Sequence, residues 1–381
     1  MPPDAGRGRR ARLAYIAHTL NPGGTERLAV DMALTFSAQY EVQVICLDEP
    51  GLWASELRQR GIAVHCLWRQ PGLDLSVVWR LARMLRKSEV DLVHAHQCTP
   101  WFYAALSRLI HRRPRLLLEE HGRFHPEVLK TKRIRVNQLL IRRLTHAFIA
   151  VSADIRERLV KYEGLVHDRI RVIYNGTRPL PALPAAERTA LRGELGYGSD
   201  AFVIGTVGRL DPIKNVPLLL RAFKALRGAH PEARLLIVGD GPERARIEAL
   251  ITDQRLGDAV TLTGFRSDAR RLLATFDVFT MASFSEGTSM ALLEAMSAGL
   301  PVTVSAVGGN PEIIQDGNTG LLFPSDDAGA LLANLERLAK NALLRQQLGN
   351  AAQTAFHERF SFDAMIAQYT GIYGELLGEA A

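Results

Sequence analysis

Two glutamates eight residues apart, Glu286 and Glu294, are the clearest pair of side chains that could do chemistry in this chain. Ser289 has a hydroxyl suited to capping a helix, and strong helix formers follow it up to Ala298. A helix N-terminus directs unpaired N–H groups at the loop before it, which suits a phosphate or a sugar hydroxyl. Apolar neighbours surround Glu294, so its carboxylate needs partners, and ribose hydroxyls would serve. A surface helix with a capping glutamate fits the same residues.

A loop with two cations stands earlier in the same half of the chain. The apolar run 202–207 ends at Gly208, and Arg209 and Lys214 follow. A guanidinium binds phosphate oxygens in pairs, and an ammonium adds a mobile point charge beside it. Together the two cations could neutralise a diphosphate, including the charge that develops as it leaves. Two solvated cations are the alternative interpretation.

Three further loops in this half combine glycine with a polar or aromatic residue. The turn 239–242 is tight and precedes a predicted helix, and Gly309 belongs to a glycine pair ahead of another helix. Between them, Phe265 and Arg266 could hold a base against the backbone. Taken together, five such loops in one series predict a single nucleotide-diphosphate site.

The first half also carries candidate residues where predicted strands end. Gly23 and Gly24 stand between a strand and a helix, which lets backbone N–H groups approach a phosphate or sugar, although an ordinary turn has the same residues. Polar side chains end four strands: His18, His96, His121 and Asn175. His121 is favoured because a glycine follows it, where the backbone must turn sharply. Packing or surface roles are open for each of them.

Strand and helix patterns alternate through the chain in two series. The first predicts strands at 13–18, 42–47, 63–67, 92–96, 115–119, 147–151 and 171–174, with helices at 26–36, 55–60, 75–86, 101–110 and 134–143. The second predicts strands at 202–207, 233–238, 260–263, 278–282 and 302–305, with helices at 185–195, 216–228, 243–253, 269–274, 290–298, 326–338 and 362–377. Alternation with short loops predicts an α/β protein with two doubly wound, mostly parallel sheets, whose ligands bind beyond the carboxyl ends of the strands.

Composition narrows the class of protein. With 381 residues, 47% of them hydrophobic, the chain is long enough for two globular domains. No apolar run reaches the roughly 18 residues of a membrane span, and the basic start, 1–12, lacks the features of a secretory signal. Three widely spaced cysteines indicate neither a disulfide framework nor a zinc cluster, which favours a cytoplasmic protein.

Charge is divided unevenly along the chain. Residues 1–180 hold 29 Lys and Arg against 17 Asp and Glu, whereas residues 181–381 hold 18 against 23. Cations are densest in the segment 107–143, which is either a solvated helix face or a patch for an anionic membrane or a lipid-phosphate acceptor. Sparse aromatic residues and the lack of a recognisable motif argue against nucleic acid as a partner.

In their order and spacing, these motifs resemble those of glycosyltransferase family 4, which has the GT-B architecture of two facing Rossmann-like domains with an interdomain cleft. The likeness covers nearly the whole chain. It is carried by Gly23-Gly24-Thr25-Glu26-Arg27, Glu120-His121-Gly122, Val151-Ser152, Asn175-Gly176, Gly208-Arg209 with Lys214, Gly239-Asp240-Gly241-Pro242, Gly264-Phe265, Glu286 with Glu294, and Gly308-Gly309.

The resemblance implies a division of the chain and roles for its residues. It implies an acceptor-binding domain at 1–180, a linker at 181–200, a nucleotide-sugar-binding domain at 201–360 and a C-terminal helix, 361–381, that returns to the first domain. The implied catalytic residues are His121, Arg209, Lys214 and Glu286. The implied substrate-binding residues are Gly23, Gly24, Asn175, Gly208, Phe265, Arg266, Glu294 and Gly309.

The sequence departs from the family pattern at two places. Many members read Gly-Phe-Gly after the first glutamate, where this chain has Gly-Thr-Ser after Glu286, so the donor sugar is left open. Members often carry an acid near Arg178, and this chain does not. The chain also lacks an Asp-x-Asp motif, which agrees with an enzyme that needs neither a metal nor another cofactor.

The function implied by the resemblance is retaining transfer of a sugar from a UDP- or GDP-sugar to a glycan or lipid-linked acceptor in cell-surface glycan synthesis. The protein would act in the cytoplasm, with peripheral contact to the membrane. A non-catalytic sugar-nucleotide binder or regulatory protein of the same fold is one alternative, and a GT-B-type epimerase or phosphorylase is another. The complete set of two cations and two glutamates argues against a pure binder.

Overall fold

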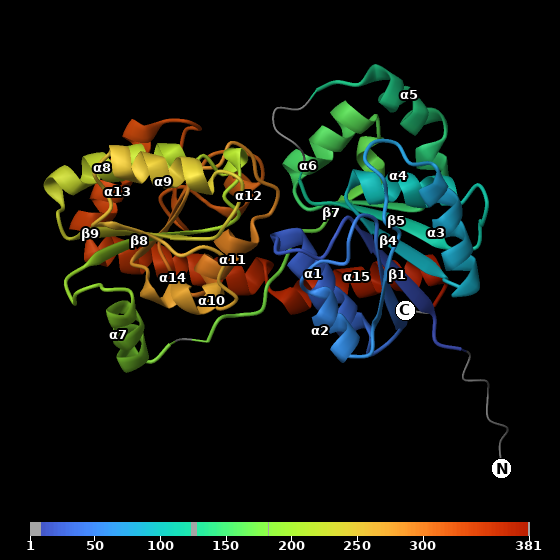
Figure 1. Cartoon of the computed structure of the whole chain (residues 1–381), viewed down its shortest axis with the longest axis horizontal. Coiled ribbons are helices and arrows are strands. Elements are labelled where there is room, and N and C mark those ends of the chain that lie inside the picture. Colours follow the sequence, from blue (N-terminus) through green and yellow to red (C-terminus); the bar gives the residue numbers. More distant parts are fainter. Residues whose placement is uncertain (1–8, 123–127, 182, 380–381) are drawn as a thin grey trace, which may run out of the picture. The chain divides into compact units, whose positions relative to one another are not determined.

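The computed structural model describes residues 9–122, 128–181 and 183–379, which form two compact units (Figure 1). Unit 1 comprises Met1–Ile173 and Ile366–Ala381, and unit 2 comprises Tyr174–Met365. Each unit is built on one sheet whose strands all pair in parallel, and helices connect successive strands. The predicted α/β class with two Rossmann-like sheets is therefore confirmed.

The sheet of unit 1 has seven strands in the order β3-β2-β1-β4-β5-β6-β7. The chain lays down β2 and β3 on one side of β1 and then crosses to the other side, so the order reverses between β1 and β4. Ligands of open α/β sheets bind at such a reversal, beyond the carboxyl ends of the strands. The strands are β1 (Arg12–Ala17), β2 (Glu41–Cys46), β3 (Ala63–Cys66), β4 (Leu92–His96), β5 (Arg115–Glu120), β6 (Ala147–Ala150) and β7 (Ile170–Val172).

Helices bury the apolar residues of both faces of this sheet. Leu116 and Leu118 of β5 pack in a core with Trp101, and all three are at most 1% exposed. Phe36 meets Tyr373 with ring centroids 4.7 Å apart. The helices are α1 (Gly24–Phe36), α2 (Ala54–Gln59), α3 (Ser76–Lys87), α4 (Cys98–Ser107), α5 (Thr131–Leu139), α6 (Ala153–Arg158), the short turns Ile141–Leu144, Leu159–Glu163 and His167–Arg169, and the unit 1 part of α15 (Phe362–Leu377).

The sheet of unit 2 repeats this plan with six strands in the order β10-β9-β8-β11-β12-β13. Its reversal lies between β8 and β11, so the loops that follow these two strands border one crevice. The strands are β8 (Phe202–Val207), β9 (Ala233–Val238), β10 (Val260–Leu262), β11 (Val278–Met281), β12 (Val302–Ser305) and β13 (Leu321–Phe323). The last strand was not predicted, because three apolar residues are too few for a period to show.

Helices also cover the second sheet. They are α7 (Ala185–Glu194), α8 (Val216–Ala229), α9 (Arg244–Asp253), α10 (Ala269–Leu272), α11 (Met290–Ser297), α12 (Asn310–Ile313), α13 (Ala328–Lys340), α14 (Ala342–Arg359) and the short turns Pro212–Lys214 and Leu273–Thr275. The described residues of the segment 181–200, predicted as a linker, lie in unit 2. There α7 buries Leu191, and Arg192 of the same helix is hydrogen-bonded to Asp277 at 2.6 Å.

Among the described residues, no helix combines the length and apolar content needed to cross a membrane.

Candidate active site

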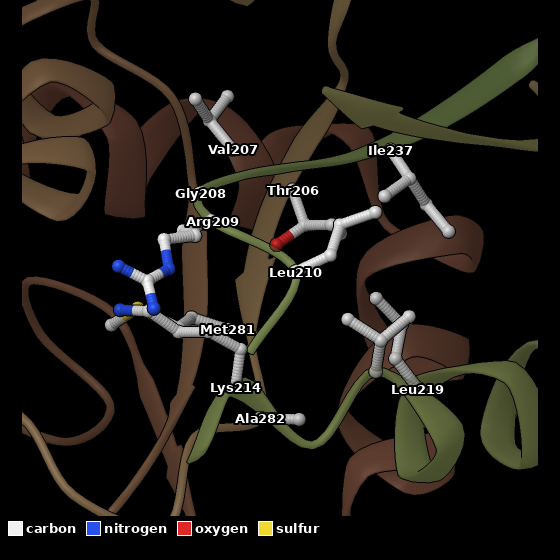
Figure 2. A pocket seen from close by; sticks show the side chains of 11 residues that line it. Thr206, Val207, Gly208, Arg209, Leu210, Lys214, Leu219, Ile237, Met281 and Ala282 are labelled. Atoms are coloured by element: carbon white, nitrogen blue, oxygen red, sulfur yellow. The ribbon is translucent and has the colours of Figure 1, made fainter. Parts of the chain in front are cut away.

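The loop after β8 carries the two cations predicted to hold a diphosphate. Arg209 and Lys214 line one hollow together with Gly208, and in Figure 2 both side chains extend toward the same side of it. Arg209 forms an ion pair with Asp211 at 2.7 Å and is 63% exposed in its side chain, so its guanidinium can turn toward a ligand at little cost. Lys214, only 27% exposed, is held more firmly.

Glu286 fixes the ammonium of Lys214. The Nζ atom lies 2.6 Å from Oε1 of Glu286, and the hydroxyl of Ser283 donates to the same oxygen at 2.6 Å. Ser283 and Glu286 follow β11, while Lys214 follows β8, so the reversal in strand order brings them together. This arrangement joins the two predicted loops at the carboxyl ends of the two central strands.

The glycine pair Gly308–Gly309 packs against the backbone of Glu286. The amide of Gly309 donates to the carbonyl oxygen of Glu286 at 3.1 Å. At Gly308, φ is +53°, and a Cβ there would lie 1.9 Å from the same oxygen. Glycine is required at this position for both reasons, since a side chain would displace the backbone of Glu286.

Glu294 lies within α11, whose N-terminus is capped by the Ser289 hydroxyl. The helix begins at Met290, so the carboxylate is about one turn into the helix. Its Oε1 lies 3.3 Å from Nε of Arg270, and the Glu294 side chain is 17% exposed. Arg270 also donates to the carbonyl oxygen of Arg178 at 2.5 Å. The carboxylate thus has a cationic partner while one edge stays accessible to a ligand.

The structure places the remaining unit 2 candidates in different ways. Phe265 is 47% exposed, and Arg266 pairs with Asp268 through two contacts of 2.7 Å, so both are available at the surface near the end of β10. Asn175 is buried and donates to the carbonyl oxygen of Thr288 at 3.0 Å. That bond braces the loop ahead of α11, a supporting part that the substrate-binding prediction did not include.

In unit 1 the glycine loop follows β1, one of the two strands at the reversal, and His121 follows β5, which lies beside the other, β4. Gly23 and Gly24 begin α1 after β1, and the carboxylate of Glu26 folds back against Gly23. His121 follows β5 and is 7% exposed. Burial opposes a charge on its ring, yet the carboxylates of Glu119, Glu120 and Glu26 together raise the pKa of His121 above its ordinary value. His18, by contrast, pairs with Asp48 at 3.2 Å on a partly exposed edge.

A buried cluster that the sequence did not reveal surrounds Glu119. Its Oε2 lies 2.9 Å from His94 Nε2, 3.2 Å from His96 Nδ1 and 3.5 Å from His121 Nε2. Despite burial, the charge of His121 and the hydrogen bonds of the histidines hold the pKa of Glu119 well below its usual range. Burial lowers the pKa of both His94 and His96, so these two rings are neutral at pH 7.

This cluster does not have the convergent geometry of a metal site. Nitrogens of His94 and His96 and an oxygen of Glu119 lie within 4.8 Å of one another. The two rings, however, are stacked with centroids 4.3 Å apart and planes at 20°. A ligand nitrogen binds an ion in the plane of its ring, and nearly parallel planes this far apart cannot share one ion at the roughly 2.0–2.1 Å expected for zinc. The contact of His94 Nε2 with Glu119 is an electrostatic one, and His96 Nδ1 lies 3.0 Å from His121 Nε2.

Some partners of the predicted residues could be found only from the structure. Ser283, Arg270 and Glu119 hold three of the predicted side chains, and none forms a recognised motif with its partner. A signal existed for the histidines, because residues two apart on a strand lie on one face, as His94 and His96 do.

Among the cations predicted to contact a membrane, Arg123 lies outside the described residues.

Two units that each have a parallel, Rossmann-like sheet are the architecture of the GT-B glycosyltransferases. The family model described as "Glycosyl transferases group 1" matches residues 187–355, and that described as "Glycosyltransferase Family 4" matches residues 22–179. The protein is a glycosyltransferase, and it belongs to glycosyltransferase family 4.

Named relatives support this assignment over most of the chain. The N-acetyl-alpha-D-glucosaminyl L-malate synthase of Bacillus anthracis is 26% identical over 82% of this chain and 82% of its own length. The UDP-Gal:alpha-D-GlcNAc-diphosphoundecaprenol alpha-1,3-galactosyltransferase of Escherichia coli is 28% identical over 88% and 89%. Among solved structures, HepE of Anabaena, crystallised with UDP and glucose, has a TM-score of 0.85 at 24% identity over 95% of this chain and 99% of that one, which shows the common fold.

Proposed function

We propose that the protein is a retaining, metal-independent transferase that moves a sugar from a UDP- or GDP-sugar to the hydroxyl of a glycan or lipid-linked acceptor in cell-surface glycan synthesis. The carrying observation is the pairing of Lys214 with Glu286 at 2.6 Å, beside Arg209 in one hollow at the strand reversal of unit 2. The names of the relatives support UDP as the first nucleotide to test, since one uses UDP-galactose and another fold relative was crystallised with UDP.

In this proposal, unit 2 supplies charge where the bond to the diphosphate breaks. Arg209 binds phosphate oxygens through its fork of N–H groups, and Lys214 neutralises the negative charge that grows on the leaving oxygen. Glu286 keeps the ammonium in place before the donor arrives and offers its carboxylate to the sugar. Glu294 accepts hydrogen bonds from the ribose hydroxyls. The acceptor hydroxyl attacks from the face that the diphosphate leaves, and its proton passes to the leaving oxygen.

In unit 1, His121 is assigned to the transferred sugar. Its ring is buried, its Nε2 faces an ionised carboxylate, and its pKa is raised, so the charged form persists toward neutral pH. A charged imidazole donates hydrogen bonds to sugar hydroxyls more strongly than a neutral one does. His121 therefore orients the sugar while unit 2 receives the diphosphate.

Donor hydrolysis in the absence of an acceptor tests this function. The purified chain is incubated with a panel of UDP- and GDP-sugars, and free nucleotide diphosphate and free sugar are measured with and without EDTA. We expect slow release from one donor, unchanged by EDTA, and an α-configured product when the donor is α-linked. Formation of sugar 1-phosphate from a glycan and added inorganic phosphate, with no nucleotide diphosphate released from any donor, would identify a phosphorylase, and tight binding without release would identify a pure binder.

We also propose that unit 1 contacts an anionic membrane through the segment around α5. Apolar side chains are exposed there beside cations: Val128 is 69% exposed and Leu139 is 68% exposed. Lys132 and Arg135 are exposed on the same helix. Apolar side chains that enter the headgroup region together with cations that attract anionic lipid are the two parts of an interfacial contact. Such a contact would bring the enzyme to a lipid-linked acceptor at the cytoplasmic face.

Sedimentation with liposomes tests the membrane contact. The variant Lys132→Glu/Arg135→Glu is compared with a control of equal charge change in unit 2, Lys224→Glu/Lys340→Glu, whose positions are also exposed. We expect the chain to sediment with vesicles that contain anionic lipid, the α5 variant to lose most of this binding, and the control to retain it. Equal binding to neutral vesicles, or equal loss in both variants, would contradict the proposal.

A further inference from the structure

The C-terminal helix reaches the Glu119 cluster of unit 1 through two tyrosines. Tyr369 and Tyr373 lie one turn apart on α15 and are both fully buried. The hydroxyl of Tyr369 donates to Glu119 Oε1 at 2.5 Å, and the hydroxyl of Tyr373 lies 2.7 Å from His94 Nδ1. Phenylalanine would fill the same space without burying a hydroxyl, which costs free energy unless it is hydrogen-bonded. Packing alone therefore does not explain why these two positions hold tyrosine.

The direction of each hydrogen bond follows from Glu119, because an ionised carboxylate can only accept. His94 Nε2, at 2.9 Å from the carboxylate, must carry a proton, and this leaves Nδ1 of the neutral ring as an acceptor. The Tyr373 hydroxyl therefore donates to His94 and accepts from the hydroxyl of Tyr15 at 3.1 Å. The Tyr369 hydroxyl thus donates to one oxygen of the buried carboxylate, and the proton on His94 Nε2 lies close to the other.

His121 is the histidine of this cluster that has a ring nitrogen available to a ligand. Its Nε2 lies 3.0 Å from His96 Nδ1 and 3.5 Å from Glu119 Oε2, so this nitrogen holds a proton between two acceptors. Its Nδ1 is buried and has no hydrogen-bond partner among the residues that the structure describes. A buried polar atom without a partner is costly unless a ligand completes it. The remaining charged groups that act on the His121 ring are Glu120, at the end of β5, and Glu26 of α1.

We propose that Tyr369 is a positioning residue for the transfer reaction. Its hydroxyl holds the carboxylate of Glu119 with one oxygen 3.5 Å from Nε2 of His121, where its charge stabilises the charged ring, and this leaves Nδ1–H of that ring directed at the sugar. The inference rests on the proposed function, because it takes the sugar as the ligand of His121. Tyr369 touches neither the donor nor the acceptor in this scheme, and it acts through Glu119.

The variant Tyr369→Phe tests the inference, because it removes one hydroxyl and leaves the ring. Without this donor the ionised carboxylate of Glu119 is less stabilised, above all when His121 is neutral. The proton that Glu119 and His121 share is therefore bound more tightly by the pair. It also resides on Glu119, and not on His121, in a larger fraction of the molecules. We expect the alkaline limb of the kcat–pH profile to move to higher pH. We expect kcat to fall about tenfold, a fraction of what positioned acid–base groups supply, with KM for the donor within about twofold.

A control and a second readout separate positioning from general damage. Tyr40→Phe also removes a phenol hydroxyl bonded to a carboxylate, that of Glu379 at 3.2 Å, without touching the histidines. It should leave kcat and its pH profile unchanged. Nitrogen-15 NMR of labelled histidines in the resting protein reports the charge of His121 directly. In the wild type we expect His121 to stay charged above pH 6.5 while His94 and His96 stay neutral.

The outcomes divide cleanly between the inference and the function on which it rests. An unchanged His121 spectrum in Tyr369→Phe, or an altered spectrum with unchanged kcat, would overturn the inference. If Tyr369→Phe does not fold, Glu119→Gln replaces it and should lower the pKa of His121; a wild-type His121 that is neutral at pH 6.5 overturns the inference without any variant. If the spectra behave as expected but no nucleotide sugar is turned over, the proposed function falls and the hydrogen-bond assignment stands.

Discussion

Replacing Lys214 by alanine tests whether unit 2 binds a diphosphate, because the change has separable effects on the free energy of unfolding and on kcat. In the folded protein, Glu286 loses an ammonium 2.6 Å away and keeps the hydroxyl of Ser283, while its side chain is 8% exposed. A buried charged group that loses a partner costs about 1–3 kcal/mol. Lys214 is 27% exposed, so solvent screens part of the pair, and we expect a loss of about 1–2 kcal/mol.

The loss of rate should be much larger than the loss of stability. If Lys214 neutralises charge on the leaving diphosphate, its removal should lower kcat by about 10²–10³, the effect of removing one preorganised stabilising group. The unfolding midpoint should fall by only about 2–8 °C, from the free-energy loss and the size of the unit. Donor turnover at saturation and differential scanning calorimetry measure the two effects on the same preparation.

A double-mutant cycle shows which effect belongs to which partner. Glu286→Gln in the Lys214→Ala background removes the unpaired charge, so it should restore part of the stability but none of the turnover. Lys340→Ala breaks an exposed pair with Glu336 at 3.5 Å and should change stability by less than about 0.5 kcal/mol and turnover not at all. A Lys214→Ala enzyme within about threefold of wild-type kcat would refute the diphosphate assignment, because screening cannot hide a factor of 10².

Three further predictions address other parts of the two sites. Gly308→Ala should destabilise the protein by more than the roughly 1 kcal/mol of Gly317→Ala in urea unfolding, since both have positive φ but only at Gly308 would the Cβ lie 1.9 Å from a carbonyl oxygen. Glu294→Ala should weaken nucleotide binding by about tenfold or more in calorimetry, through the loss of charged hydrogen bonds to ribose. The stability advantage of wild type over Glu119→Gln should be greatest between about pH 4.5 and 6.5. It should shrink below that window as the lowered-pKa carboxylate of Glu119 is protonated, and above it as the raised-pKa ring of His121 loses its proton, as followed by urea unfolding at each pH.

Much of the fold could be predicted, because the apolar pattern of a strand or helix is contained in a short stretch of sequence. The predicted helix 362–377 has the bounds of α15, and the strand 202–207 has those of β8. These segments are long and have a regular apolar period. The helix α14 (Ala342–Arg359) was not predicted, because few of its residues are buried and polar residues interrupt its apolar stripe; its N-cap Asn341 was its one local signal.

The site could be predicted only as a set of loops. Sequence order does not reveal that β1 lies beside β4 or that β8 lies beside β11, and these neighbours decide which loops share a crevice. Lys214 meets Glu286 across 72 residues, and Tyr369 meets Glu119 across 250. No spacing rule links residues so far apart, so the partners that set the charge of the predicted side chains had to come from the structure.

The two sites differ in how much of their order exists before a ligand binds. The cluster of unit 1 is buried: Glu119 and His121 form an ion pair at 3.5 Å, and the Tyr369 hydroxyl donates to the other oxygen of Glu119. In unit 2, Lys214 is held by Glu286, but Arg209 is 63% exposed and its pairing with Asp211 is open to solvent. Fixing such a side chain costs conformational entropy, which the proposed diphosphate would offset. In the proposed reaction, binding of the nucleotide would therefore order the cation of unit 2, whereas the sugar would meet a histidine in unit 1 that is already oriented.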